Sequence, residues 1–311
     1  MCAVFGLIDY KCVFTAKQRE RILRVLSIEC EVRGVDATGF AFNSGGKLKI
    51  FKRPFPAHEM RLKLTDDVNI ILGHTRMTTQ GNSQHNFNNH PFFGNAGIKF
   101  VLAHNGMLRN ENFIRHELSI PESHIQTDSY IAVQILEKLG ALNEKTLAEM
   151  AEKVSGEFVF TLLDEDNNFY FIKGNNPLAL YHFEAGFYIY ASTDMILEYA
   201  LDELRLDEHP YQEIENHAGD IIRIDSNGNL TRYSFVPDVQ YFDDTYSLCD
   251  VFTYRNLTQY ADQCGVDWRY IGELLSYGYS PDEIEDLLCV PGGIEMAVQE
   301  ILGEYDWYGE W

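Results

Sequence analysis

Apolar and polar residues alternate along much of this chain in short segments, and the pattern predicts strands that pair as hairpins. An apolar run covers residues 3–8, and two further buried strands are predicted at residues 69–77 and 98–103. Elsewhere, pairs of short apolar segments flank clusters of Gly, Asn, Asp and Ser, which favour turns. These pairs predict hairpins over residues 40–51, 158–173, 178–192 and 221–235.

Other segments have the spacing of amphipathic helices. Thr15 and Gln18 form a capping-box pattern, which begins a predicted helix that runs to about Cys30. A second helix is predicted over residues 127–139 with Thr127 as its N-cap, and two more cover residues 144–154 and 194–204. Hairpins indicate antiparallel sheets, and helices between them indicate a layered α+β domain.

The composition is that of a globular protein with a substantial core. The 311 residues are 45% hydrophobic, which fits one large domain with a smaller one, or two domains. The start lacks a secretory signal pattern and no apolar run reaches about 18 residues, so we expect no membrane segment and a cytoplasmic location. The six cysteines lack C-x-x-C spacing, so we expect no zinc site and no disulfide framework, and nothing indicates a cofactor.

Charge divides the chain into two parts. The net charge of −22 argues against nucleic acid as a partner, because phosphate repulsion would have to be overcome by a basic patch. Residues 236–311 hold 16 Asp and Glu against Arg255 and Arg269, which gives −14 and leaves −8 of the −22 for the residues before them. We therefore predict two units, residues 1–236 and residues 237–311.

The second predicted unit has the pattern of three short helices. They cover residues 268–277, a segment capped by Ser280 with Pro281 in its first turn, and residues 293–303. Their order is similar to that of a ubiquitin-associated bundle, a resemblance that implies a protein partner for these helices. The alternative is that they dock on the main domain.

Cys2 stands directly behind Met1. If Met1 is removed, the Cys2 thiol lies within reach of its own α-amino group, whose pKa of about 7.7–8.0 lets that group act as a base near neutral pH. Thiolate is the attacking form of cysteine, so this pair needs no separate histidine. The alternative is that Cys2 is a small buried core residue.

Three further polar clusters are placed where predicted strands end or a helix begins. Arg76 could bind a carboxylate through its guanidinium, or form a surface ion pair. The Asn105 side chain and the Gly106 backbone could donate to an oxyanion, or form an Asn-Gly hairpin turn. Asp128 could hold a substrate ammonium, or complement a helix dipole.

Together with Cys2, these clusters resemble the glutaminase domain of class II glutamine amidotransferases, which are N-terminal-nucleophile hydrolases. The resemblance spans about residues 2–235 and implies a four-layer αββα sandwich with Cys2 at one sheet edge. It is carried by an ordered set of residues: Cys2, Ala3, Val4, Phe5, Gly6, Arg33, Gly34, Asp36, Gly39, His74, Thr75, Arg76, Thr79, Gly81, Asn89, His90, Pro91, His104, Asn105, Gly106, Thr127, Asp128, Asn176, Pro177, Leu178, Ala191 and Ser192.

The same resemblance implies roles for single residues. Cys2 would be the nucleophile, and Asn105 and Gly106 would form the oxyanion hole. Arg76 would bind the α-carboxylate of glutamine and Asp128 its α-ammonium. Arg33 and Gly34 are implied to lie beside the nucleophile. Thr79 and Gly81 are implied to line the glutamine pocket.

Departures from the family pattern also bear on function. Met77 and Gln80 stand where the sugar-phosphate branch of the family has Trp and His, and the residues after Phe235 hold no motif of an ammonia-consuming synthase. We therefore expect L-glutamine to be hydrolysed to glutamate and ammonia, with the ammonia passed to a separate synthase or ligase. Two alternatives stay open: a free-standing amidohydrolase for another γ-glutamyl or small amide substrate, and a protein-binding adaptor with a vestigial glutaminase site.

Overall fold

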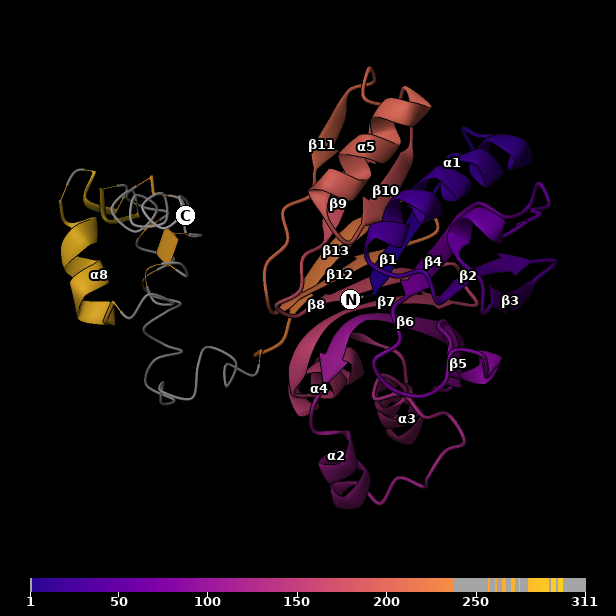
Figure 1. Cartoon of the computed structure of the whole chain (residues 1–311), viewed down its shortest axis with the longest axis horizontal. Coiled ribbons are helices and arrows are strands. Elements are labelled where there is room, and N and C mark those ends of the chain that lie inside the picture. Colours follow the sequence, from indigo (N-terminus) through magenta and orange to yellow (C-terminus); the bar gives the residue numbers. More distant parts are fainter. Residues whose placement is uncertain are drawn as a thin grey trace, which may run out of the picture. The chain divides into compact units, whose positions relative to one another are not determined.

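The chain divides into two compact units, Met1–Asp238 and Val239–Trp311 (Figure 1). The structure is a computed structural model. It describes residues 2–237 and 279–290, together with positions 257, 261, 265, 266, 270, 271, 274, 292–294 and 296–298. The predicted boundary after residue 236 lies beside the division between the units.

The first unit contains a seven-stranded sheet in which the first strand of the chain is central. In spatial order its strands are β11 (Tyr211–Glu213), β9 (Ala179–Phe183), β10 (Phe187–Ala191), β1 (Ala3–Ile8), β4 (Ile70–Arg76), β2 (Ala37–Ser44) and β3 (Lys47–Arg53). β1 pairs antiparallel with β10 on one side and with β4 on the other. Cys2 therefore precedes the middle strand of this sheet and not an edge strand.

A second, six-stranded sheet belongs to the same unit. Its strands are β13 (Leu230–Ser234), β12 (Asp220–Ile224), β8 (Phe169–Lys173), β7 (Gly156–Asp164), β6 (Lys99–Leu108) and β5 (Phe92–Asn95). Every neighbouring pair in this sheet is antiparallel. The four predicted hairpins are confirmed, as β2–β3, β7–β8, β9–β10 and β12–β13.

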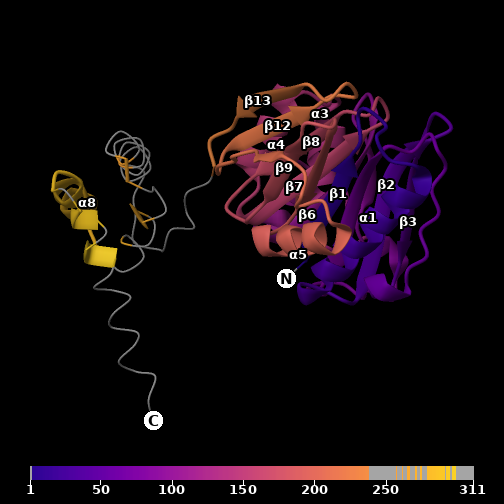
Figure 2. The same cartoon turned by 90° about the horizontal axis from the view of Figure 1, so that it is seen from above.

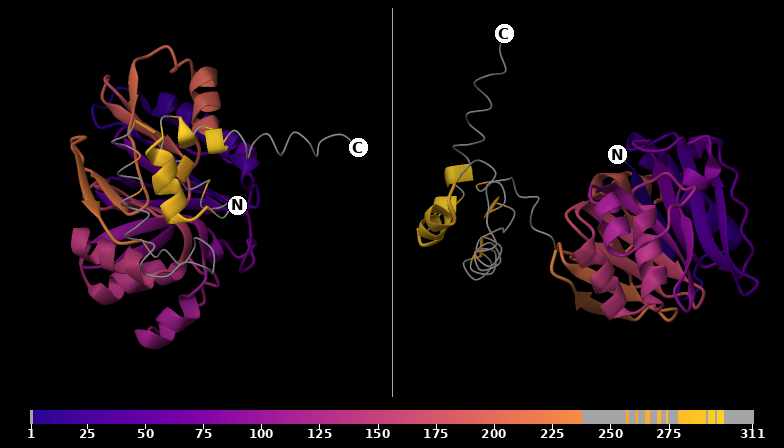
Figure 3. Two further views of the ribbon diagram at one scale, coloured as in Figure 1. Left: turned by 90° about the vertical axis from the view of Figure 1, so that its left-hand side faces the viewer. Right: turned by 90° about the horizontal axis from the view of Figure 1, so that it is seen from below.

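Helices cover the outer faces of both sheets and complete an αββα sandwich. α1 (Ala16–Glu29) packs against α5 (Asp194–Leu204) over the seven-stranded sheet (Figure 2). α3 (Tyr130–Leu139) and α4 (Glu144–Lys153) cover the six-stranded sheet, which Figure 3 shows from below. The predicted fold class is therefore confirmed. Shorter helices connect these elements: η1 (Cys30–Val32), η2 (Ala57–Glu59), η3 (Asn86–Asn88) and α2 (Glu111–Glu117).

The alternation of side chains along β1 explains why this strand lies inside the sandwich. Phe5 and Leu7 belong to the core between the seven-stranded sheet and its helices, whereas Val4 and Ile8 belong to the core between the two sheets. Successive strand residues point to opposite faces, so both faces of β1 are buried. The strand that follows Cys2 is thus fixed from both sides.

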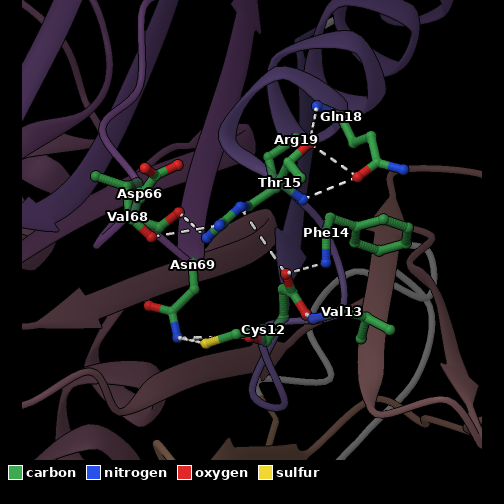
Figure 4. Close-up of polar contacts among 10 residues, drawn as sticks. Cys12, Val13, Phe14, Thr15, Gln18, Arg19, Asp66, Val68 and Asn69 are labelled. Atoms are coloured by element: carbon green, nitrogen blue, oxygen red, sulfur yellow. Dashed lines mark hydrogen bonds and ion pairs between the residues drawn. The ribbon is translucent and has the colours of Figure 1, made fainter.

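A buried polar network joins the start of α1 to the end of β1 (Figure 4). The Asp9 carboxylate accepts hydrogen bonds from Val13 N at 2.7 Å and Phe14 N at 3.1 Å. Arg19, which is 2% exposed, lies 3.9 Å from that carboxylate and donates to the carbonyls of Asp66 and Val68. The capping box of Thr15 and Gln18 is confirmed at the same helix start. This network fixes the helix layer relative to the central strand.

The second unit has a small apolar core of its own. α8 (Pro281–Leu288) begins after Ser280, whose hydroxyl accepts a hydrogen bond from Glu283 N, so the predicted cap at Ser280 is confirmed. Ile284 and Leu288 of α8 contribute to that core. The predicted helices at residues 268–277 and 293–303 lie largely outside the described residues. The ubiquitin-associated bundle stays a prediction.

Some predicted element boundaries are wrong, and the alternative of an Asn-Gly turn at Asn105 is excluded. β6 continues through Asn105 and Gly106 to Leu108, and Gly106 pairs with Phe158 of β7, so there is no Asn-Gly turn at this position. Thr127 does not cap α3, because that helix begins at Tyr130 and the Thr127 hydroxyl has no partner among the described residues. β5, β11 and α2 were not predicted.

The elements that the structure describes include no helix with both the length and the apolar character needed to cross a bilayer. The same residues contain no group of three or more His, Cys, Asp or Glu side chains placed to hold a metal ion.

Candidate active site

Cys2 lies at the open end of β1 and is held there by its backbone. Its carbonyl accepts a hydrogen bond from Arg33 Nε at 2.8 Å, and its half-buried thiol lies 3.6 Å from the Met77 carbonyl, to which it donates. Arg33 follows η1, directly after the end of α1. Arg33 thus lies beside the backbone of Cys2.

Burial and two opposite charges act on the reactivity of the Cys2 thiol. Burial raises its pKa, and the negative charge of Asp128 acts in the same direction. A backbone hydrogen bond at Met77 and the positive charge of Arg76 oppose this rise in pKa. The thiol therefore depends on neighbouring positive charge to reach its nucleophilic, ionised form.

Asn105 brings an unused donor to the neighbourhood of Cys2. Its side chain is fully buried, and its Oδ1 accepts a hydrogen bond at 3.4 Å from Nη2 of Arg33, the residue that also holds the Cys2 carbonyl. The Asn105 backbone carbonyl accepts from Asn176 Nδ2 at 2.8 Å. The Asn105 Nδ2 group has no hydrogen-bond partner among the described residues. Because an unsatisfied buried donor costs about 1–3 kcal/mol, this group is suited to a ligand oxygen.

The residue after Asn105 must be glycine for steric reasons. Gly106 has a φ of +149°, and a Cβ atom at this position would lie 1.8 Å from the Glu157 carbonyl oxygen and 2.7 Å from His104 Nε2. Only a residue without a side chain allows β6 to approach β7 this closely. Gly106 and Cys2 both line one small pocket.

Arg76, at the end of β4, is buried and already engaged. It is 3% exposed, its Nη1 donates to Asn89 Oδ1 at 2.7 Å, and its Nη2 donates to the Gln80 carbonyl. Burial lowers the pKa of Arg76, and the charges of Cys2, Asp36 and Asp128 oppose that shift. Such a guanidinium is suited to a carboxylate, but in this conformation the segment after β4 takes up part of its donor capacity.

Asp128 lies just before α3 and is held by strand β6. Its Oδ2 accepts from Leu108 N at 2.6 Å, and its Oδ1 accepts from the Ser129 hydroxyl at 3.2 Å. The Asp128 backbone N–H donates to Gln80 Oε1 at 3.1 Å. The carboxylate is 5% exposed and lines the same pocket as Cys2 and Arg76.

The other predicted site residues divide into two groups. Thr79 is exposed and lines the pocket of Cys2. Gly81 is not among the residues that line this pocket; it has a φ of +67° and packs near the Gln126 carbonyl. Gly34 fits against the backbone of Arg76 and Met77, where a Cβ atom would lie 2.4–2.5 Å from backbone atoms. Gly34 therefore acts on packing next to the site.

In this conformation the pocket is almost filled. Its free volume is about 10 Å³, roughly the space of one water molecule. Gln80 lines this pocket, where its carbonyl accepts from Arg76 and its side chain accepts from Asp128 N. A ligand of the size of an amino acid requires the segment after β4 to move.

Three histidines and a serine around this pocket were given no role by sequence reasoning. His74 Nε2 donates to the His104 carbonyl at 3.0 Å, and the ring centroids of His74 and His90 lie 4.2 Å apart. Burial lowers the pKa of all three rings, so they are neutral near pH 7. His104 contacts Ser129 at 2.8 Å. These histidines are part of the sequence motifs, but only the folded structure shows which side chains they contact.

Comparisons with known proteins agree with this arrangement. Residues 74–198 match the model of a glutamine amidotransferase domain, a span that includes Arg76, Asn105, Gly106 and Asp128. The chain is 29% identical over 205 residues to a glutamine–fructose-6-phosphate aminotransferase (isomerizing) from Geobacillus kaustophilus, which covers 63% of this chain and 33% of that protein. The protein of the same name from Staphylococcus epidermidis is 28% identical over 236 residues, which cover 73% of this chain and 36% of that protein. The chain thus spans about a third of the length of these curated relatives.

Solved structures share the fold at low sequence identity. A glutamine phosphoribosylpyrophosphate amidotransferase from B. subtilis superposes with a TM-score of 0.57 at 18% identity, covering 89% of this chain and 64% of that one. An allosteric regulatory enzyme of purine biosynthesis has a TM-score of 0.59 at 17% identity, covering 88% of this chain and 63% of that one. These matches agree with the resemblance drawn from the motifs: residues 74–198 fit the model of a glutamine amidotransferase domain, and the solved structures confirm the fold.

Proposed function

This chain carries a glutamine amidotransferase domain, and from that premise we propose that it hydrolyses L-glutamine to glutamate and ammonia through Cys2. The observation that carries the proposal is the bridge made by Arg33. One guanidinium bonds both the Cys2 carbonyl and Asn105 Oδ1, which links the backbone of the nucleophile to a residue whose buried Nδ2 donor has no described partner.

The proposed reaction begins after removal of Met1. The free α-amino group of Cys2 takes the thiol proton, and the thiolate attacks the carboxamide carbon of glutamine. The carbonyl oxygen becomes an oxyanion, to which Asn105 Nδ2 and the Gly106 backbone N–H donate. The protonated amine then gives its proton to the leaving nitrogen, ammonia departs, and water hydrolyses the γ-glutamyl thioester to release glutamate and restore Cys2.

The two charged residues of the pocket give the site its substrate preference. We propose that Arg76 binds the α-carboxylate of glutamine and that Asp128 binds its α-ammonium. Their burial supports these roles, since Arg76 is 3% and Asp128 5% exposed and buried charged groups need partners of opposite charge. Arg33 supports the nucleophile, and Thr79 contributes to the pocket wall. Gly34 and Gly81 give the backbone the close packing and the turn that this wall needs.

Ammonia transfer is a further part of the proposal. We propose that the ammonia passes to a separate synthase or ligase in the cytoplasm, and that the acidic residues 237–311 bind a protein partner. The names of the curated relatives support a transfer reaction, because those proteins are glutamine–fructose-6-phosphate aminotransferases, of which this chain matches about a third of the length. An adaptor with a vestigial site is disfavoured by the intact set of Cys2, Arg76, Asn105, Gly106 and Asp128.

The test is ammonia release from L-glutamine by protein whose mass shows that Met1 is absent. We expect Cys2→Ala to abolish release while the thermal unfolding temperature stays near that of the parent. Cys12→Ala, at an exposed free cysteine, is the matched control and should retain full activity. Turnover by Cys2→Ala, or full activity in protein that retains Met1, would exclude the proposed nucleophile.

A further inference from the structure

Two residues that are hydrogen-bonded to each other beside Asp128, His104 and Ser129, have no assigned role. The Ser129 hydroxyl contacts both His104 Nδ1, at 2.8 Å, and Asp128 Oδ1, at 3.2 Å. A hydroxyl has one proton, so it can donate to only one of these atoms and must accept from, or leave unsatisfied, the other. The direction of the hydrogen bonds through Ser129 decides what the Asp128 carboxylate presents to the pocket.

The carboxylate is the stronger acceptor of the two. A hydrogen bond to an ionised carboxylate is roughly twice as strong as one between neutral groups, so the Ser129 proton is best placed on Asp128 Oδ1. Ser129 Oγ must then accept from His104 Nδ1. Because burial keeps the His104 ring neutral, its one ring proton can serve either the contact of Nδ1 with Ser129 at 2.8 Å or a hydrogen bond from Nε2 to the Glu157 carbonyl at 3.3 Å. The shorter distance, together with the charge of Asp128 at the end of the network, favours the proton on Nδ1.

Strand β6 supplies the other half of this arrangement. Leu108 N holds Asp128 Oδ2 at 2.6 Å, so both carboxylate oxygens are held from β6, one directly and one through Ser129. The same strand carries Asn105 and Gly106. One strand therefore fixes the donors proposed for the amide end of the substrate and the carboxylate proposed for its amino end.

We infer that His104 and Ser129 are positioning residues, which orient the Asp128 carboxylate to select ligands that carry an α-ammonium group. The inference rests on the proposed function, because it assigns the ammonium site to Asp128. His104 acts only through Ser129. It is 1% exposed and packs on Phe160 with ring centroids 4.7 Å apart, so its ring orientation is fixed by the core.

The experiment compares two ligands that differ only in the ammonium group, L-glutamate and glutarate. Dissociation constants of both are measured by calorimetry on the full chain without Met1. We expect the parent to prefer L-glutamate, and we expect Ser129→Ala to reduce this preference about tenfold with little change in the affinity for glutarate. Ser129→Thr keeps the hydroxyl and should keep the preference. Ser27→Ala, which removes another buried hydroxyl on the outer helix α1, should leave both affinities unchanged.

A pair of variants tests the direction of the hydrogen bonds that run from His104 through Ser129 to Asp128. His104→Asn keeps an N–H donor near the Nδ1 position, whereas His104→Gln places its amide near the Nε2 position, and both lose the same ring packing. We expect His104→Asn to retain more of the preference for L-glutamate than His104→Gln.

Three results would overturn the inference. They are an unchanged preference in Ser129→Ala, an equal loss of affinity for both ligands in that variant, and a parent that binds glutarate as well as L-glutamate. Failure of the proposed function is a separate observation, namely no ammonia release from L-glutamine by the parent.

Discussion

Several buried polar groups at this site have no hydrogen-bond partner, and neither do groups elsewhere among the described residues such as Asn43 Oδ1 and Arg223 Nε. Among the described residues, Asn105 Nδ2 and both ring nitrogens of His90 are buried without a partner. Each such group lowers the free energy of unfolding by about 1–3 kcal/mol, and these groups lie where a substrate oxygen would bind. Stability given up at a site in this way is typical of preorganised binding groups.

Replacing Asn105 should act on the reaction more than on the fold. Asn105→Ala removes a donor that has no described partner and one long hydrogen bond, of 3.4 Å, from Arg33. We therefore expect a small change in unfolding temperature and a fall in kcat of about 10² to 10³ with a similar KM. Steady-state kinetics with L-glutamine measure this. The control is Asn43→Ala, which breaks bonds to Asp164 and Asn167 in a buried position away from the site and should cost stability without lowering kcat. An unchanged kcat in Asn105→Ala would remove Asn105 from the oxyanion hole.

The charges beside Cys2 predict pH shifts of opposite sign. Burial raises the pKa of the Cys2 thiol, so its reactivity is low in acid and rises as the pH passes through that raised value. Arg76 lowers this pKa and Asp128 raises it. We expect Arg76→Gln to move the reactivity curve to higher pH and Asp128→Asn to move it to lower pH. The measurement is the pH dependence of alkylation at Cys2, located by peptide mass spectrometry, with Cys12 as the internal control. Shifts in the same direction would contradict this electrostatic account.

Sequence patterns predict polar residues of the site but not their immediate partners. Arg76, Asn105 and Asp128 follow from motif order, because side-chain chemistry is visible in the letters. Gln80 and Ser129 could not be given roles in this way. Their importance depends on hydrogen bonds to residues 48 positions away and 25 positions away, which only the packed fold defines.

Among elements, strand β6 shows most clearly why a local reading of the sequence fails. Asn-Gly normally favours a hairpin turn, yet Gly106 stays in the strand because its lack of a side chain lets β6 approach Glu157 of β7. β5 has only four residues and includes Gly94 and Asn95, which are poor strand formers. Tertiary pairing decides both cases. Long segments with clear periodicity, such as α5 and the β7–β8 hairpin, were predictable because local pattern and packing agree.

The segment of residues 77–90 after β4 should respond to ligand binding. Gln80 lines the pocket and takes up a donor of Arg76, so we expect a bound amino acid to displace it. We expect L-glutamate to change amide hydrogen exchange within residues 77–90 and to leave the β7–β8 hairpin unaffected. Arg76→Ala is the control, because without the guanidinium the ligand should have little effect. Unaltered exchange in the parent at saturating L-glutamate would show that the ligand binds elsewhere.

For the whole molecule, the first unit should be sufficient for hydrolysis. Every proposed catalytic group lies within Met1–Asp238, and the last described residues of that unit are tied to it. Phe235 is 5% exposed in the core beneath α4, and Val236 N donates to Glu152 at 3.0 Å. We expect a chain ending at residue 238 to fold and to hydrolyse L-glutamine at the rate of the full chain.

Ammonia release and thermal unfolding of the two chains measure this, and affinity purification measures retention of partners. A shorter chain that ends at residue 229 loses β13 and Phe235 and should be insoluble, which provides the control. If the chain ending at residue 238 were insoluble or inactive, residues 239–311 would be part of the catalytic fold and the two-unit division would be wrong.

The central position of β1 also limits when Met1 can be removed. β1 begins directly after Cys2 and pairs on both of its sides, so once the sheet has folded, the backbone that follows Cys2 is held by the neighbouring strands and is not available to an aminopeptidase in extended form. β10, which completes the pairing of β1, begins at Phe187, and ribosomes synthesise that length in about 10 to 40 s. Maturation of the nucleophile is therefore expected to occur during translation, so overproduction that outpaces the aminopeptidase should yield well-folded protein that no later processing can activate.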